Sequence, residues 1–170
     1  QDRPAAAMMP GPPGKDGTAA NPRCKNPDAL GVSRTVAIDT TGGPGFGSQQ
    51  FKAHDFLERG EVVLTFDDGP WPGNTPAVLA ALASQCVKAT FFLVGHNAEA
   101  LPALVKREIA EGHTVGHHTF SHPAATLRGL SESAAQDEIL RGFQADDKAA
   151  YGTASSAPKV RFFRFPGFAD

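Results

Sequence analysis

The sequence has no strong excess of charge of one sign and no long apolar run. Its 16 Lys and Arg residues and 18 Asp and Glu residues give a formal net charge of −2, which leaves no basic face for nucleic acid. No apolar run approaches the roughly 20 residues that a membrane span requires. The 170 residues, 41% of them hydrophobic, predict one soluble domain with its own core. We therefore expect neither nucleic acid nor a membrane as partner, and the oligomeric state stays open.

Cysteine is scarce. The chain has only Cys24 and Cys86, and the absence of a Cys-x-x-Cys pattern disfavours a thiolate metal site or a redox pair. In an oxidising compartment one disulfide between them would close a loop of roughly 60 residues and contribute about 4 kcal/mol to stability through loop entropy. Two unrelated buried thiols explain the pattern equally well.

The sequence also lacks an initiating methionine and a basic-then-apolar leader, since it starts at Gln1. We expect a processed chain without its secretion signal, or a trimmed one, and a secreted, periplasmic or cell-envelope location. Residues 1–22 are rich in Pro, Gly and Ala without any period. They predict a flexible leader, which we extend to residue 30. Residues 31–170 are then expected to form the folded domain.

From residue 61 onward, short apolar runs alternate with helical patterns. Strands are expected at residues 62–66, 89–95, 113–117 and 160–163, with a further short candidate at 35–40. Helices are expected over 101–111, over 131–150 and from Thr75, with Thr75 as N-cap and Pro76 at the first helical position. Steady alternation of strand and helix predicts βαβ units and a parallel sheet.

Polar residues that could bind a ligand or take part in catalysis follow three of these strands. Asp67 and Asp68 end the first, His118 and His122 follow the third, and Arg164 follows the fourth. Ligands bind at the carboxyl ends of parallel strands. One carboxylate and two imidazoles can hold a divalent cation with one position open, which leaves the other carboxylate as a base. The four-residue spacing predicts that both imidazoles lie on one face of a helical turn.

Each of these features has a simpler interpretation when taken alone. An Asp-Asp pair commonly forms a turn or caps a helix, and a lone His-x-x-x-His is more often structural than metal-binding. Arg164 alone would be a structural ion-pair residue. Their occurrence in order, each at a strand end, favours one shared site.

Three segments also resemble a known family: Thr65-Phe66-Asp67-Asp68-Gly69, His118-Thr119-Phe120-Ser121-His122 and Arg164-Phe165-Pro166. In this order they are similar to the first three motifs of the polysaccharide deacetylases, the NodB-homology domain of carbohydrate esterase family 4. The resemblance covers about residues 60 to 170. It implies an α/β fold, a distorted (β/α) barrel of which this chain holds only the N-terminal portion.

The resemblance also implies residue roles. Asp67 would be the general base, kept ionised by Arg164, and Asp68, His118 and His122 would hold a divalent metal. The metal would usually be zinc, with cobalt or nickel as options. The implied reaction removes acetyl groups from an N-acetylated polysaccharide or oligosaccharide such as chitin, chitooligosaccharide or peptidoglycan.

The substrate groove is implied with less detail. Family members carry an aromatic residue directly after the Arg-x-Pro motif, whereas this chain has Gly167 there and Phe168 one position later. Pro166, Gly167 and Phe168 are therefore candidate groove residues, and a backbone N–H after the motif is a candidate oxyanion donor. Trp71 could stack on a sugar or equally pack within its own loop.

The family pattern continues beyond the third motif, with a fourth that sets the arginine and a fifth that carries the general-acid histidine. The present sequence stops at Asp170. We therefore expect an N-terminal portion of a longer protein. Two alternatives stay open: a catalytically impaired, metal-containing carbohydrate-binding fragment, and an acetylxylan esterase. A phosphoryl-transfer receiver domain is disfavoured, because histidines stand where its third aspartate would be.

The other histidines are expected to have structural roles. Strand alternation points His117 away from His118, so His117 should be packed or hydrogen-bonded in the interior. His54, His96 and His113 have no paired partner in the sequence, and we expect them to be structural or exposed.

Overall fold

A small parallel sheet is the centre of the structure. The computed structural model describes residues 24–38, 57–124, 126–155 and 157–168. Its strands pair in parallel in the order β1-β2-β3. The elements are β1 (Thr65–Asp67), α1 (Asn74–Ser84), β2 (Thr90–Leu93), α2 (Gly95–Ala100), α3 (Pro102–Ala110), β3 (Thr114–His117), the 3₁₀ turn η1 (Leu127–Gly129), α4 (Glu132–Tyr151) and the 3₁₀ turn η2 (Pro166–Phe168). The expected α/β fold with parallel strands is confirmed.

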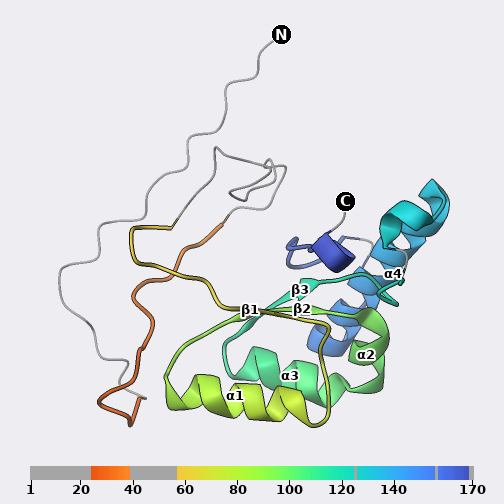
Figure 1. Cartoon of the computed structure of the whole chain (residues 1–170). Coiled ribbons are helices and arrows are strands. Elements are labelled where there is room, and N and C mark those ends of the chain that lie inside the picture. The colour runs from red at the N-terminus through yellow and green to blue at the C-terminus, as the bar shows by residue number, and fades with distance from the viewer. Residues whose placement is uncertain (1–23, 39–56, 125, 156, 169–170) are drawn as a thin grey trace.

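The core lies between the sheet and the helices on one of its faces. Figure 1 shows α1 and α3 on the same side of the strands, as two successive right-handed crossovers require. Phe91 and Leu93 of β2 point to that side and pack with Leu79 of α1 and Val105 of α3. Each fully buried aliphatic side chain of this size contributes about 1.5–3 kcal/mol through removal of apolar surface from water. Phe92, on the opposite face of β2, lies against Arg164.

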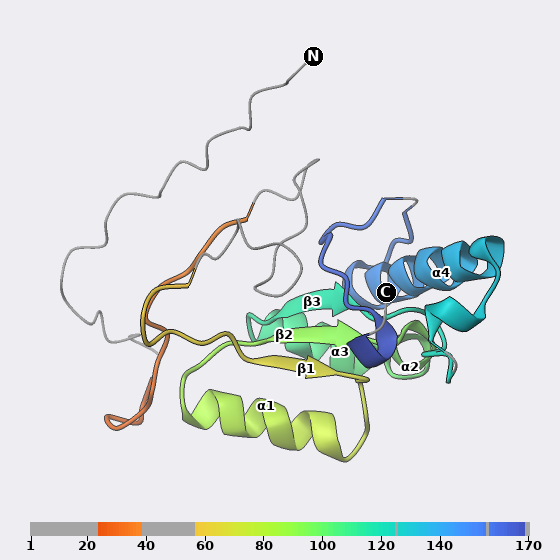
Figure 2. The same cartoon turned by 45° about the horizontal axis from the view of Figure 1, so that its top comes forward.

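Helix α4 packs against α2, α3 and β3 at the far edge of the sheet, as Figure 2 also shows. It spans Glu132–Tyr151, so its predicted position is confirmed. Ser131 caps the helix by accepting from the backbone N–H of Ala134 at 3.3 Å. The predicted helix over 101–111 is realised as α3. The six-residue α2 has no apolar stripe long enough to be recognised in the sequence. Among the described residues, no helix is both long and apolar enough to cross a membrane.

Two predicted starting points were wrong. The strand expected from Val62 begins only at Thr65, because residues 62–64 are exposed, with Val62 80% accessible. Gly73, not Thr75, is the N-cap of α1. The Thr75 hydroxyl instead accepts from the Trp71 N–H at 2.9 Å and so fixes the loop after β1.

The strand candidates at the two ends of the domain are also corrected. Residues 35–38 form no strand, and residues 39–40 lie outside the described part of the chain. The fourth strand expected at 160–163 is reduced to one parallel bridge between Phe163 and His117. The reason is that the carbonyl of Val160 accepts from the His117 side chain at 2.8 Å rather than from a strand. The bridge still brings Arg164 to the end of β3.

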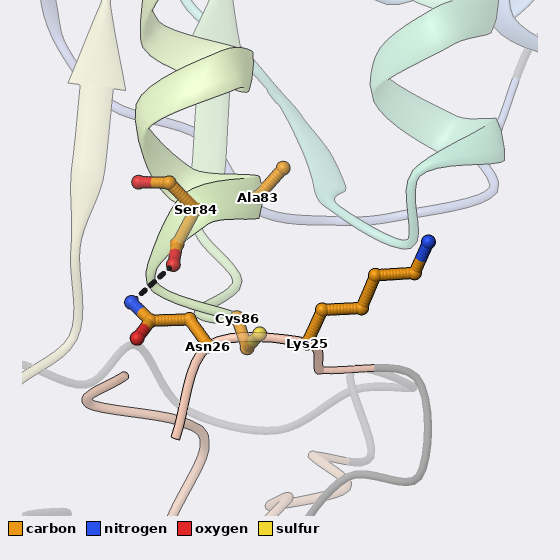
Figure 3. Close-up of a pocket in the computed structure, with 5 residues that line it drawn as sticks. All are labelled: Lys25, Asn26, Ala83, Ser84 and Cys86. Atoms are coloured by element: carbon orange, nitrogen blue, oxygen red, sulfur yellow. Dashed lines mark hydrogen bonds between the residues drawn. The ribbon is translucent and has the colours of Figure 1, made fainter. Parts of the chain in front are cut away.

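A disulfide joins Cys24 to Cys86, which decides between the two alternatives left open by the sequence. It fastens the segment after residue 24 to the chain just beyond α1, where the Asn26 side chain donates to the carbonyl of Ser84 at 3.1 Å. Figure 3 shows this junction and the hollow that Lys25, Ala83 and their neighbours line. This hollow lies at the end of α1 remote from the strand ends. Residues 1–23 of the expected leader lie outside the described residues, and the domain boundaries stay predictions.

Candidate metal centre

The loop after β1 presents Asp68 in an unusual backbone conformation. Its φ is +68°, and the Gly69–Pro70 peptide that follows is cis. Residues other than glycine rarely adopt positive φ, and such positions cluster at functional sites. Asn97 of α2 donates to the Asp68 carbonyl at 3.0 Å, so a second element holds this backbone in place. The Asp68 side chain, directly after the carboxyl end of β1, remains exposed.

Three predicted ligands converge at this point. Asp68 Oδ1 lies 3.4 Å from His118 Nε2 and 3.4 Å from His122 Nε2. The candidate ligand atoms of these residues all lie within 4.8 Å of one another. Within the described ranges no other group of three His, Cys, Asp or Glu side chains comes this close. The sequence prediction that these three side chains meet is thus realised in the geometry.

The hydrogen bonding of His118 fits a cation at this point. Its Nδ1 lies 2.7 Å from the carbonyl oxygen of Arg164, which can only accept. In the neutral ring Nδ1 therefore carries the proton, and Nε2 turns its lone pair toward the Asp68 carboxylate. Two acceptors face each other, and a cation between them would satisfy both. Two imidazole nitrogens and one carboxylate oxygen are a donor set that suits Zn²⁺ and leaves a fourth position.

The two histidines do not share a helical turn, and that prediction was wrong. His118 continues the sheet ladder, with its N–H donating to Leu93 at 2.9 Å. The chain then turns through Thr119 and His122, whose φ angles are +69° and +51°. The Thr119 hydroxyl closes this turn by accepting from the His122 N–H at 3.2 Å. A tight loop, not a helix, brings the rings together, with their centroids 5.0 Å apart.

Asp67 stands beside this group and is held by Arg164. Arg164 Nη1 donates to Asp67 Oδ1 at 2.8 Å and to the hydroxyl of Thr65 at 2.9 Å. Its guanidinium carbon lies 4.2 Å from the centroid of the Phe92 ring, a cation–π contact that fixes the plane of the group. The backbone N–H of Arg164 bonds to His117. The expected proximity of Asp67 and Arg164 is therefore present.

His117 is buried and hydrogen-bonded, as the strand alternation predicts. Its Nδ1 lies 2.8 Å from Asp146 Oδ2 of α4. Burial raises the pKa of Asp146 to about 7, against the opposing effect of its bond with His117. Glu108 of α3 is fully buried nearby, and neither of its carboxyl oxygens has a hydrogen-bond partner within the described part of the chain. Burial and then the charge of Asp146 raise the pKa of Glu108 to about 8.

The remaining predicted residues lie around the site with fewer contacts. Trp71 is half exposed in the loop after β1, Pro166 is buried, and Gly167 has a φ of +62°. The side chain of Phe168 lies outside the description. Among the other histidines, His113 is buried and bonds to the N–H of Ala89, His96 is exposed, and His54 lies outside the described residues. The roles expected for the groove residues stay predictions.

Several site residues were not found from the sequence. Four residues at distant positions in the sequence contact the site or the residues next to it: Asn97, Phe92, Asp146 and Glu138. Their contacts are long-range, so no local pattern marks them. Thr65 belongs to the first motif, and its alternation with Asp67 along β1 could have indicated that both side chains face Arg164.

The fold and the site together define the class of this protein. It is a parallel α/β protein with a candidate metal centre of two histidines and one aspartate at the carboxyl ends of its strands. Residues 56–169, well over half of the chain, match the polysaccharide deacetylase family. The chain belongs to this family.

Curated relatives match over shorter stretches of the chain. A peptidoglycan-N-acetylglucosamine deacetylase of Bacillus cereus is 48% identical over 83 residues, which cover 49% of this chain and 30% of the relative. A chitooligosaccharide deacetylase of Sinorhizobium fredii is 53% identical over 68 residues, which cover 40% of this chain and 32% of the relative. The matched region spans about a third of the length of these relatives.

Solved structures of the same family share the fold. A family 4 carbohydrate esterase from Streptomyces lividans in complex with acetate superposes with a TM-score of 0.56 at 36% identity, covering 66% of this chain and 54% of the other. A family 4 acetyl xylan esterase from Clostridium thermocellum in complex with a cobalt ion gives a TM-score of 0.53 at 34% identity, covering 63% of this chain and 49% of the other. Both matches extend over about half of the solved chain.

Proposed function

We propose that this chain carries the centre of a metal-dependent hydrolase that removes acetyl groups from an N-acetylated polysaccharide or oligosaccharide. The observation that carries the proposal is that two adjacent carboxylates have different partners. Asp68 faces two imidazoles at 3.4 Å, whereas Asp67 turns to Arg164 at 2.8 Å. A site built only to hold a metal has no need of the second carboxylate or of the arginine that orients it.

The roles follow from this geometry. Asp68, His118 and His122 would hold a divalent cation, with zinc preferred for the donor set and cobalt or nickel as substitutes. When bound, the cation supplies Lewis-acid chemistry by polarising an acetyl carbonyl and lowering the pKa of water. Arg164 donates to Oδ1 of Asp67, so we assign Oδ2 to accept the proton of the attacking water.

The substrate class rests on the relatives. The names of two of them specify deacetylases of peptidoglycan N-acetylglucosamine and of chitooligosaccharide, which supports an N-acetylated sugar polymer as substrate. We place Trp71, Pro166, Gly167 and Phe168 along the groove as the sugar-contacting residues. A bacterial cell-wall substrate and the disulfide both fit a secreted or cell-envelope location.

An acetylxylan esterase is the second candidate, because one structural neighbour bears that name. Both reactions use the same residues in the same roles, since each transfers an acetyl group to water. The carbohydrate-binding fragment is less well supported, because it leaves the Asp67–Arg164 pair without a purpose.

Acetate release tests the proposal directly. The full-length protein to which these residues belong, stripped with a chelator and then supplied with zinc or cobalt, should release acetate at least about tenfold faster than the stripped protein. The substrates are chitooligosaccharide, N-acetylated peptidoglycan and acetylated xylan, assayed separately. Faster release from the first two assigns the deacetylase, and faster release from xylan assigns the esterase. If the full-length protein binds zinc but releases acetate from none of the three, the catalytic proposal is wrong.

A further inference from the structure

We propose that Glu138 of α4 is a positioning residue for the metal ligand His122. This inference rests on the proposed metal site. It concerns the ligand loop, defined here as residues 118–122. Glu138 lies outside the three family motifs of this sequence, 16 positions beyond the end of the loop.

The contacts of Glu138 with the loop are threefold. Its Oε2 accepts from the backbone N–H of Ser121 at 2.8 Å, and its Oε1 accepts from the Ser121 hydroxyl at 3.0 Å. Its own carbonyl accepts from the backbone N–H of Phe120 at 2.9 Å. Glu138 therefore accepts hydrogen bonds from both backbone N–H groups and from the one hydroxyl of the two residues that precede His122. A carboxylate acceptor makes such bonds stronger than neutral ones.

The opposite side of the loop is held by the start of α2. The backbone N–H of Gly95 donates to the Thr119 carbonyl at 3.0 Å, and that of His96 donates to the Phe120 carbonyl at 2.8 Å. The carbonyls of Thr119 and Phe120 thus bond to α2, and the N–H groups of Phe120 and Ser121 bond to Glu138 of α4. Satisfying both sets at once fixes the peptide planes of a segment that has positive φ at Thr119.

Contact between backbones sets the distance between α4 and the loop. A Cβ atom built on Gly142 would lie 2.7 Å from the carbonyl carbon of Thr119 and 2.9 Å from its oxygen. Only glycine permits this approach, one helical turn beyond Glu138. The helix backbone therefore stops the loop from moving inward, and the Glu138 bonds stop it from moving outward.

His122 is the ligand that depends most on this arrangement. The His118 side chain is 3% exposed and is also fixed by the sheet ladder and by Arg164. The His122 side chain is 37% exposed and follows Ser121 directly. A shift of Ser121 would move the His122 imidazole away from Asp68, and groups that orient ligands in this way typically change metal affinity by about 10–100-fold.

The test compares Glu138→Ala with Glu138→Gln in the full chain. Zinc and cobalt affinities are measured by calorimetry, and amide exchange of Ser121 is followed by NMR without metal. Glu138→Ala should weaken zinc binding by about 10–100-fold and remove the protection of the Ser121 amide. Glu138→Gln should stay within about threefold of the wild type, because its amide oxygen accepts from the N–H and its NH₂ donates to the hydroxyl.

Glu132→Ala is the matched control, since it removes the same charge from the exposed surface of the same helix. Within the described residues, the Glu132 carboxylate accepts a hydrogen bond from Gln136 and forms none with the ligand loop. It should leave zinc affinity unchanged. Unchanged affinity in Glu138→Ala would overturn the inference. An equal loss in Glu138→Gln would also overturn it, because charge rather than hydrogen bonding would then be responsible. If the wild type binds zinc but releases no acetate, the proposed function fails, and these affinities still decide the role of Glu138.

Discussion

Replacing Asp67 with Asn should lower the rate of acetate release by about 10²–10⁴-fold, the usual contribution of a general base. Asparagine keeps the shape of the side chain, and its oxygen can still accept from Arg164, which bonds to Oδ1 at 2.8 Å in the wild type. It cannot accept a proton from water. Asp68, His118 and His122 are unchanged, so zinc affinity should stay within about threefold of the wild type.

The measurement pairs initial rates of acetate release with metal content in the same protein samples. Asp28→Asn is the control, because Asp28 is exposed and lies in the N-terminal segment near the far end of α1, and this variant should retain full activity. Full activity in Asp67→Asn would show that Asp67 is not the general base. A loss of both activity and zinc would instead place Asp67 among the ligands.

The sequence predicted the order of strands and helices where the hydrophobic pattern was long, and it predicted that Asp68, His118 and His122 lie close together. The parallel sheet and α4 followed from periodicity, whereas the Ser131 cap was found only in the structure. Asp68, His118 and His122 could be grouped because carboxyl ends of parallel strands share one edge of a sheet. That argument needs only topology, so it does not depend on the conformation of the loops.

Features that depend on tertiary contacts could not be predicted. The spacing of His118 and His122 suggested a helical turn, but bonds to α2 and α4 impose a loop with positive φ. The fourth strand was lost because the His117 side chain captures the carbonyl of Val160. In both cases a hydrogen bond between residues distant in sequence overrides the local preference. Glu138 reads in the sequence as an ordinary surface residue of a helix, yet it binds the ligand loop.

The buried carboxyl groups behind the site should make the fold less stable as the pH rises. Glu108 has an ordinary pKa of 4.5 that burial and Asp146 raise to about 8. Between these values the folded state holds a proton that the unfolded chain releases, so stability is full below pH 4.5 and is lost as the pH approaches 8. Each such group lowers the free energy of unfolding by up to about 1.4 kcal/mol per pH unit, a tenfold change in the folding equilibrium.

Asp146 acts in the same direction over a lower range. Burial raises its pKa from 3.8 to about 7, while His117 opposes the shift and Asp147 adds to it. The two carboxyl groups therefore act in the same direction, and both lower the free energy of unfolding as the pH rises above their ordinary pKa values. Because Glu108 and Asp146 act together, a substitution of Glu108 is needed to separate its contribution.

Glu108→Gln should reduce the loss of stability with rising pH, because glutamine stays neutral at every pH and has the shape of the protonated acid. The variant should be more stable than the wild type at pH 8 and differ little from it near pH 5. Urea unfolding at single pH steps from 5 to 8 measures this. Glu99→Gln serves as the control, since Glu99 is exposed on α2 and should leave the wild-type slope intact. An unchanged slope in Glu108→Gln would mean that Glu108 is already ionised in the folded protein. Its buried oxygens would then have to contact a cation that neutralises them or water that hydrates them.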